Sequence, residues 1–223
     1  MGRVVTIDGP AASGKTSVSR ELARRLGWYW VSTGAFYRGL AYVAQRLKYN
    51  LDDEQALAKL ASGNIWKVEM AENKTRVYLD VNGEFKDVTD AVAAEDVGSI
   101  ASKVSHFPKV RQALLEGQRD CSHRTEGLVA EGRDCGTVVF PDAEVKIYLT
   151  ARSENRAERR AKELGLNAQA TAEAQSVRDH QDSTRKVAPM QIPENALVLD
   201  STELNLDQVV SRVEAHVRQI LHK

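Results

Sequence analysis

The sequence contains few cysteines, and those present form no pattern that binds metal or builds disulfides. Its 223 residues include two cysteines, Cys121 and Cys135, which form no CxxC pair, and the five histidines show no metal-ligand spacing. We therefore expect neither a disulfide framework nor a zinc site. This cysteine usage favours a reducing, cytoplasmic compartment.

An excess of either charge and a long apolar run are also absent. Lys and Arg together number 31, as do Asp and Glu, so no overall positive field would hold a nucleic acid polymer or an anionic membrane. The N-terminus lacks the apolar core of a signal peptide, and no run of about 18 apolar residues occurs. We expect a soluble cytoplasmic monomer that meets any anionic partner through local groups.

Short apolar runs alternate with longer segments of helical periodicity along most of the chain. This alternation is typical of βα units around a parallel sheet, so it predicts an α/β fold with a single domain over residues 1–223. The predicted strands are residues 4–7, 28–31, 128–130, 145–149 and 197–199. The predicted helices are residues 17–26, 35–47, 153–164 and 206–221.

Residues 65–90 interrupt this alternation. Val77, Leu79 and Val81 alternate with polar neighbours, and Asn82-Gly83 is a strong hairpin turn. We predict a small antiparallel β insertion here, which leaves a core of residues 1–64 and 91–223.

The octapeptide GPAASGKT, residues 9–16, directly follows the first predicted strand and precedes the first predicted helix. It matches the P-loop pattern GxxxxGK[ST] in full and in the required context. Glycines let backbone N–H groups close around phosphate oxygens, and the helix N-terminus faces the same anion. Lys15 would reach the β- and γ-phosphates, and the Thr16 hydroxyl would bind Mg²⁺. The predicted nucleoside triphosphate site comprises Gly9, Pro10, Ala11, Ala12, Ser13, Gly14, Lys15, Thr16 and Ser17.

Two classes of P-loop protein remain open, a nucleotide switch and a kinase. A switch of the GTPase type needs an NKxD guanine reader, but the nearest candidate, Asn73-Lys74-Thr75-Arg76, ends in Arg and lies in the insertion. Asp80-Val81-Asn82-Gly83 spells DxxG, but hairpin turn chemistry explains it better. The sequence favours a kinase, with a kinase for another small acceptor or a switch as alternatives.

Five segments occur in the order seen in bacterial cytidylate kinases, and the likeness covers nearly the whole chain. They are GPAASGKT at 9–16, STGAFYR at 32–38, FPKVR at 107–111, EGRDCGTVVFPDA at 131–143 and RKVAP at 185–189. The sequence thus resembles this branch of the nucleoside monophosphate kinases. The resemblance implies an adenylate-kinase-like fold with a five-stranded parallel core. It also implies a monophosphate-binding region enlarged by the insertion, and a short lid near residues 151–167. The implied reaction moves the ATP γ-phosphate to CMP or dCMP.

The resemblance also implies a set of acceptor-side residues. Cytosine has an N4 amine that donates beside N3 and O2 atoms that accept, so its readers should be an acceptor and an arginine. Asp134, Ser102 and Arg111 match those readers. Arg178, Asp182 and Arg185 match contacts to the acceptor's phosphate and sugar, and their spacing puts them on one face if the segment is helical. Thr33, Arg38 and Arg133 complete the implied acceptor site, with Arg38 expected in the first turn of its helix and Arg133 just past a strand end.

Four arginines in the predicted lid share one helical face, because Arg152, Arg156, Arg159 and Arg160 follow i, i+4, i+7, i+8 spacing. This face would close over the triphosphate, with Arg156 and Arg160 as the better candidates. The alternative is an ordinary salt-bridged surface helix, because Glu154, Glu158 and Glu163 are interleaved.

Catalysis needs no general base, because an acceptor phosphate is already anionic and nucleophilic. We expect charge neutralisation by Lys15, Arg133, Arg156, Arg160 and Arg185. Glu131 stands where relatives often carry Asp, and a carboxylate there would order Mg²⁺ waters or orient Arg133.

Overall fold

The computed structural model describes residues 2–71, 74–165 and 167–221, so residues 72–73 of the insertion and residue 166 of the lid lie outside it. A parallel five-stranded sheet has the order β2-β6-β1-β7-β8, which confirms the predicted core. Its central strand is β1, where Ile7 pairs with Glu131 of β6 and with Ile147 of β7. The strands are β1 (Arg3–Asp8), β2 (Tyr29–Ser32), β6 (Gly127–Gly132), β7 (Val145–Thr150) and β8 (Leu197–Asp200).

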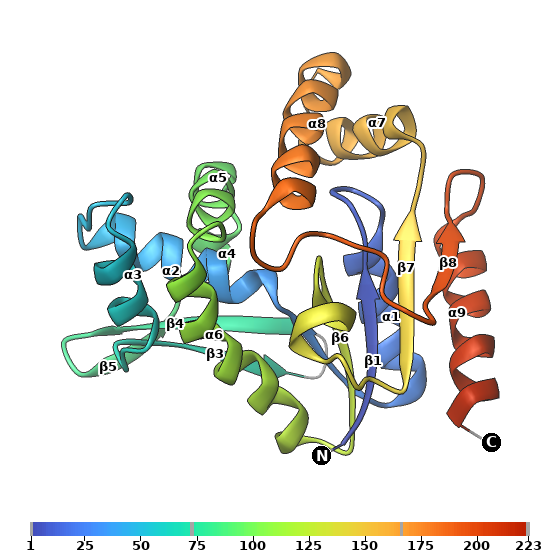
Figure 1. Cartoon of the computed structure of the whole chain (residues 1–223), viewed down its shortest axis with the longest axis horizontal. Coiled ribbons are helices and arrows are strands. Elements are labelled where there is room, and N and C mark those ends of the chain that lie inside the picture. The colour runs from blue at the N-terminus through green and yellow to red at the C-terminus, as the bar shows by residue number, and fades with distance from the viewer. Residues whose placement is uncertain (1, 72–73, 166, 222–223) are drawn as a thin grey trace.

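Helices cover both faces of this sheet (Figure 1). Val5 and Ile7 of β1 pack in one core with residues of α1 (Lys15–Leu26) and α9 (Leu206–Leu221). Val4 points to the opposite core, which contains residues of α2 (Gly34–Arg46), α3 (Glu54–Ala61) and α6 (Pro108–Asp120). Side chains of β1 therefore face two different cores, and both faces of the strand are buried, as is usual for a central parallel strand.

The predicted antiparallel insertion is a three-stranded sheet of β3 (Trp66–Ala71), β4 (Lys74–Val81) and β5 (Glu84–Asp87). Asn82 and Gly83 both have positive φ, 59° and 87°, as a type I′ hairpin turn requires. Trp66 is 6% exposed and packs over Gly39 of α2, where a Cβ would lie 2.7 Å from the indole ring. The insertion is therefore seated on the core. The short α4 (Thr89–Val92) and α5 (Glu95–Val104) follow it.

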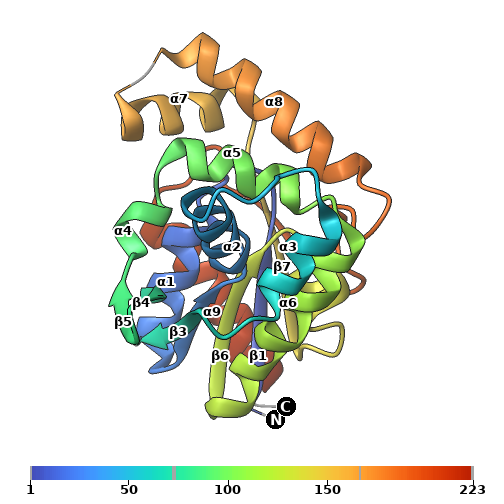
Figure 2. The same ribbon diagram turned by 90° about the vertical axis from the view of Figure 1, so that its left-hand side faces the viewer.

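The region of the predicted lid, residues 151–167, is followed by a further helix that the sequence did not indicate. After the expected α7 (Ser153–Leu164) comes a second helix, α8 (Ala168–Thr184), which packs against α7. Both helices lie above the carboxyl ends of the strands (Figures 1 and 2). This is the edge where open parallel sheets bind ligands.

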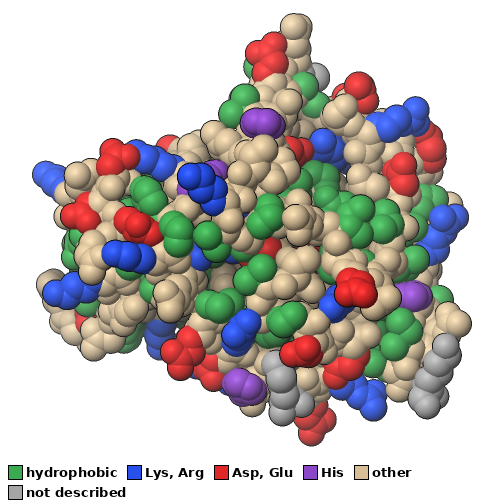
Figure 3. All heavy atoms as spheres, viewed as in Figure 1, with side chains coloured by type: hydrophobic (Ala, Val, Ile, Leu, Met, Phe, Trp, Pro, Cys, Tyr) green, Lys and Arg blue, Asp and Glu red, His purple; other side chains and the backbone are tan. Residues whose placement is uncertain are grey.

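Two short helical turns flank β6, η1 (Cys121–Arg124) before it and η2 (Cys135–Val139) shortly after it. Among the described helices, none combines the length and apolar character needed to cross a bilayer. Acidic and basic side chains are intermingled on the face shown in Figure 3, in line with their equal numbers in the sequence.

Candidate active site

The P-loop connects β1 to α1 in the strand–loop–helix arrangement that the sequence predicts. Gly9 has φ +152°, and a Cβ there would lie 2.0 Å from the carbonyl oxygen of Leu149, so no larger residue fits. Gly14 has φ +88° and immediately precedes α1. The N-terminus of α1 therefore faces the loop, where its free N–H groups favour an anion.

Lys15 is the first residue of α1, and its side chain bonds back to the loop. Its Nζ donates to the carbonyl oxygen of Pro10 at 2.9 Å, and the residue is 7% exposed. Burial, followed by the positive charge of Arg133, lowers the pKa of Lys15 to about 7. A buried ammonium needs a negative partner, and a bound phosphate would supply one.

An oxygen-rich corner lies beside the P-loop. Glu131, at the end of β6, is 4% exposed, and its Oε1 accepts from Ser32 Oγ at 2.6 Å and from Thr16 Oγ1 at 3.2 Å. Hydroxyl and carboxylate oxygens suit Mg²⁺, which uses one or two protein ligands together with water and phosphate. The described ranges contain no group of three or more His, Cys, Asp or Glu that would hold a metal alone. Thr16 and Glu131 therefore fit a Mg²⁺ that arrives with a triphosphate.

Two of the three expected base readers are in contact. Arg111 of α6 donates from Nη2 to Oδ2 of Asp134, which follows β6, and its guanidinium lies over the Tyr37 ring at 5.4 Å from the centroid. The third, Ser102, lies on α5, where its Oγ is 3.5 Å from Oε1 of Gln181 on α8. Arg111, Asp134 and Tyr37 thus come from α6, the segment after β6 and α2, while Ser102 of α5 contacts α8.

A cationic cluster surrounds Asp182 of α8. Arg133 donates from Nε to Asp182 Oδ2 at 2.8 Å and from Nη1 to the carbonyl oxygen of Gly9 at 3.0 Å, so it spans the acceptor side and the P-loop. Arg185 Nη1 lies 3.7 Å from Asp182 Oδ1. Burial alone would raise the pKa of Asp182, but Arg133 holds that pKa below its ordinary value.

Two donors of this cluster point to a missing acceptor. Within the described part of the chain, the Nε atoms of Arg178 and Arg185 are buried and have no hydrogen-bond partner. Burial, followed by the charge of Arg133, lowers the pKa of Arg178. Buried polar groups are nearly always hydrogen-bonded, so these donors fit an anionic ligand such as a phosphate.

Arg38 lies later in its helix than expected, and Thr33 is buried beside β6. Arg38 lies in the second turn of α2, not the first, because the helix already begins at Gly34. Its Nη1 donates to the carbonyl oxygens of Val92 at 3.0 Å and Ala94 at 3.1 Å. Thr33 is 3% exposed, and its hydroxyl donates to the carbonyl oxygen of Glu131 at 3.0 Å. This bond ties the start of α2 to β6, and the substrate contact expected of Thr33 stays a prediction.

The four lid arginines separate into two pairs. Arg152 pairs with Glu203, and Arg159 donates from Nη2 to the carbonyl oxygen of Ser201 at 2.7 Å, so both bind the segment after β8. Arg156 donates from Nη1 to the carbonyl oxygen of Ala11 at 2.8 Å. All of these partners belong to segments other than α7. Glu163 is one of the acids in the alternative of a salt-bridged surface helix, and its side chain is not among those that the structure describes.

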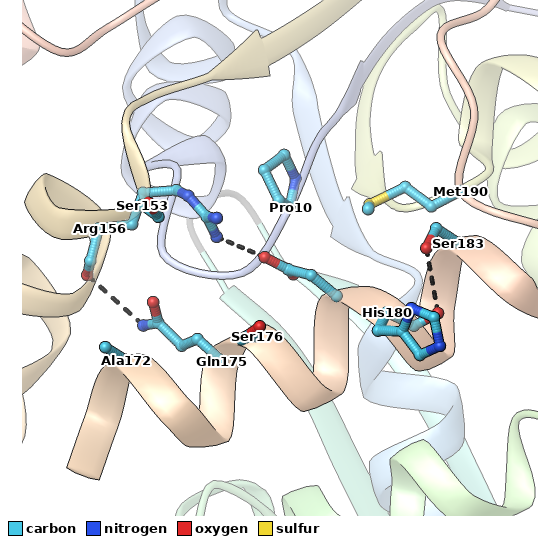
Figure 4. A pocket seen from close by; sticks show the side chains of 10 residues that line it. Pro10, Ser153, Arg156, Ala172, Gln175, Ser176, His180, Ser183 and Met190 are labelled. Atoms are coloured by element: carbon cyan, nitrogen blue, oxygen red, sulfur yellow. Dashed lines mark hydrogen bonds and ion pairs between the residues drawn. The ribbon is translucent and has the colours of Figure 1, made fainter. Parts of the chain in front are cut away.

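Arg156 and Arg160 form the second pair, and their expected role over the triphosphate stays a prediction. Figure 4 shows Arg156 extending from α7 toward α8, with the P-loop residue Pro10 nearby. Arg160 donates from Nη2 to Glu95 Oε2 of α5 at 2.8 Å, on the acceptor side of the cleft. One helix thus directs one guanidinium to the P-loop and another to α5.

Comparison with known proteins identifies the family. The family model described as cytidylate kinase matches residues 5–219. A cytidylate kinase of Bdellovibrio bacteriovorus is 63% identical over 218 residues, which cover 98% of this chain and 99% of that protein. The chain belongs to the cytidylate kinase family. A cytidylate kinase of Aeromonas salmonicida is 43% identical over 226 residues, with coverage of 99% and 96%.

Solved structures of low sequence identity to this chain share the fold. A gluconokinase from Sinorhizobium meliloti has a TM-score of 0.51 at 13% identity, over 99% of this chain and 94% of that one. An uncharacterized protein from Eubacterium ventriosum has a TM-score of 0.53 at 10% identity, over 96% and 98%. At such identities the likeness concerns the fold alone. Cytidylate kinase membership does not favour the nucleotide-switch alternative.

Two carboxylates of this cytidylate kinase family member were missed by sequence reasoning. Asp8, at the end of β1, is fully buried, and its two oxygens accept from the N–H groups of Cys135 at 2.8 Å and Gly136 at 2.7 Å. Burial raises the pKa of Asp8 to about 6. Asp179 of α8 accepts from the N–H of Ala11 at 2.9 Å. The sequence signal that could have identified Asp8 is its position as an acidic residue at the end of an apolar run. For Asp179 the sequence offers no signal other than its position next to Arg178.

Proposed function

We propose that this chain transfers the γ-phosphate of ATP to CMP or dCMP, giving ADP and CDP or dCDP. One observation carries the proposal: Arg133 bonds both the first P-loop residue, Gly9, and Asp182 of the acceptor-side cluster. A triphosphate on the loop and a monophosphate on the cluster would therefore be neighbours. Membership of the cytidylate kinase family supports the same reaction.

On the donor side, residues 9–17 would bind ATP through backbone N–H groups and the N-terminus of α1. Lys15 would exchange its bond to Pro10 for phosphate oxygens, which would restore its full charge. Thr16 and Glu131 would hold Mg²⁺, whose role is to neutralise phosphate charge and to orient the triphosphate. Thr16 Oγ1 and Glu131 Oε1 lie 3.2 Å apart, which supports a shared ion or shared water ligands.

On the acceptor side, three arginines would bind the monophosphate. Arg133 is already positioned by Asp182, while Arg178 and Arg185 offer the buried unpartnered Nε atoms described above. Asp182 would also accept from a sugar hydroxyl. Arg38 would join after its bonds to the backbone carbonyls of Val92 and Ala94 are exchanged for phosphate.

Base selection would rest on the buried pair of Arg111 and Asp134 with Ser102 beside it. Cytosine presents its N4 donor to Asp134 and Ser102, and its N3 and O2 acceptors to Arg111. Uracil carries an acceptor at position 4 and a donor at N3. Its acceptor would therefore face the acceptor Asp134, and its donor would face the donor Arg111. The cost of such a mismatch is largest where water is excluded.

The chemical step needs positioning and charge neutralisation. An oxygen of the acceptor phosphate attacks the γ-phosphorus, and the bond from that phosphorus to the β–γ bridging oxygen breaks, so that ADP keeps the electron pair. Lys15, Arg133, Arg156, Arg160 and Arg185 would stabilise the charge on the transferred group. We propose that the lid comprises α7 and α8, that the insertion serves the acceptor region, and that both exclude water.

We also propose that the enzyme is a cytoplasmic monomer with small-molecule substrates and no membrane or nucleic acid polymer partner. Its equal numbers of acidic and basic residues support this. Cys121 and Cys135 are buried and free, as suits a reducing compartment.

The proposal is tested by coupled ADP release with Mg²⁺, ATP and each of CMP, dCMP, UMP, AMP and GMP, and with no acceptor. We expect the highest kcat/KM for CMP and dCMP, with one CDP or dCDP formed per ADP. ATP hydrolysis at the same rate without an acceptor would overturn the kinase assignment. A preference for AMP or GMP would overturn the acceptor assignment alone.

A further inference from the structure

Asp179 of α8 occupies a donor of the P-loop. Its Oδ1 accepts from the backbone N–H of Ala11 at 2.9 Å, and its Oδ2 accepts from Arg156 Nη1 at 2.5 Å. Arg156 Nη1 also donates to the carbonyl oxygen of Ala11 at 2.8 Å. The three groups form a closed set that joins both lid helices to the loop.

This carboxylate has the ligand chemistry of a phosphate. P-loop N–H groups and lid arginines are donors that bind anionic oxygens, and a carboxylate and a phosphate compete for them. Asp179 reaches the loop from a residue 168 positions further along the chain, so the contact depends on lid placement and not on local turn geometry. Its side chain is 16% exposed and that of Arg156 is 11% exposed, so solvent weakens the contact little.

The charges around the loop favour a negative group at this position. Burial lowers the pKa of Lys15, and the charge of Asp179 opposes that shift. Burial also acts to lower the pKa of Arg133, but Asp182 and then Asp179 raise it. Figure 4 shows where this contact lies: Pro10 of the P-loop on one side, α8 with Gln175 and His180 on the other. These residues line a cleft of about 420 Å³, which leaves room for side-chain movement.

We propose that Asp179 is an intramolecular competitor of the triphosphate, which holds the Ala11 amide and Arg156 in the nucleotide-free enzyme and is displaced by a phosphate oxygen when ATP binds. The inference rests on the proposed use of the P-loop for ATP. Asp179 therefore sets the affinity for nucleotide, because each binding event must break its two bonds. Displacement also releases α8 from the loop, so that Arg156 can transfer to phosphate.

A permanent structural role makes the opposite prediction. If Asp179 only oriented Arg156 for a bound nucleotide, its removal would weaken nucleotide binding. If Asp179 competes, its removal strengthens binding, although it deletes a hydrogen bond of the free enzyme. The sign of the change in affinity therefore separates the two roles.

The test is isothermal calorimetry with a non-hydrolysable ATP analogue and with inorganic pyrophosphate, on wild type and Asp179→Asn. Glu173→Gln is the matched control, because Glu173 is an exposed acid on the same helix and its loss changes net charge equally. We expect Asp179→Asn to bind both probes at least fivefold more tightly, with Glu173→Gln within twofold of wild type. Adenosine, which has no phosphate, should bind all three proteins equally.

Equal or weaker binding of both probes by Asp179→Asn would overturn the competition. Equal tightening in Glu173→Gln would also overturn it, because net charge would then explain the effect. Asp179→Ser removes the same charge with a smaller side chain and serves if the Asn variant does not fold. A wild-type enzyme that binds neither the analogue nor pyrophosphate would instead contradict the proposed ATP site.

Discussion

Arg111 and Asp134 form an ion pair although their side chains are only 8% and 7% exposed. Removal of one member of a buried pair leaves the other charge unpaired, which typically costs about 3–5 kcal/mol of stability. The pair is therefore costly to break and has donors and acceptors to offer a cytosine edge. This relationship links base selection to stability, so variants at the site need a control for folding.

We predict that Asp134→Asn lowers the preference for CMP over UMP. The amide retains the volume but donates as well as accepts, so the acceptor for the cytosine amine is weakened. A hydrogen bond in a desolvated site is worth about 1–3 kcal/mol, or about 5-fold to 150-fold in the ratio of kcat/KM for CMP to that for UMP. Arg38→Ala should reduce kcat/KM for both acceptors and leave the ratio unchanged. The roles are reversed if Arg38→Ala shifts the ratio and Asp134→Asn does not.

We predict that Lys15→Ala reduces turnover far more than stability. The ammonium should stabilise charge on the phosphates most strongly as the γ-phosphoryl group leaves ADP, and loss of such a group typically costs about 10²–10³ in kcat. The thermal midpoint should rise or stay constant, because the variant removes a buried cation. Lys59→Ala, at an exposed position of α3, should leave kcat unchanged. Near-normal turnover by Lys15→Ala would remove Lys15 from the catalytic set.

We predict proton uptake when ATP binds at pH 8. The pKa of Lys15 is lowered to about 7 by burial and by Arg133, so the free enzyme holds this amine mostly neutral at that pH. Phosphate charge beside it would raise the pKa back toward the ordinary 10.5, so close to one proton would be bound at pH 8. Calorimetry in buffers of different ionisation enthalpy measures this number. Lys15→Ala is the reference, and equal uptake by both proteins would contradict the prediction.

We predict that Asp8 makes the enzyme less stable as pH rises from 4 to 6. Burial, opposed by the amides of Gly136 and Cys135 and helped by the charge of Asp134, gives Asp8 a pKa of about 6 in place of the ordinary 3.8. The folded state therefore binds more protons than the unfolded state in this window, so the free energy of unfolding falls with pH. The loss amounts to about 3 kcal/mol at 1.36 kcal/mol per pKa unit.

Chemical unfolding of wild type and Asp8→Asn across this pH range measures the Asp8 contribution. The Asn variant should lose about 3 kcal/mol less between pH 4 and pH 7 than wild type, apart from a constant offset for its altered hydrogen bonds. Parallel curves for the two proteins would show that Asp8 does not titrate in this window.

The five core strands, the hairpin insertion and the P-loop were predictable from sequence, because each carries a local signal. Apolar runs mark buried parallel strands, and Asn82-Gly83 marks the turn of the insertion. The second lid helix was not predicted. Its buried positions are polar, with Thr171 7%, Gln175 8% and Asp182 5% exposed, so no apolar stripe signals the helix.

The candidate site likewise contains some residues that the sequence predicted and others that it did not. Lys15 and Thr16 follow from a contiguous motif, and Arg111 and Asp134 from segments that resemble a family. Asp8 and Asp179 act through backbone N–H groups 127 and 168 positions away, and Ser32 through a carboxylate 99 positions away. Such contacts depend on how the sheet brings strand ends together, which spacing along the chain does not encode.

Because β1 is the central strand, its position determines when the P-loop can fold during synthesis. Arg3 pairs with Gly127 and Val5 with Val145, so β1 has no neighbour in this sheet until β6, which begins at Gly127, has been synthesised. Gly9 itself packs against the carbonyl of Leu149. A nascent chain that ends before β7 contains the whole GPAASGKT sequence but not the strand against which Gly9 packs. Long-range pairing of this kind slows folding, and here it delays nucleotide binding until the sheet has assembled.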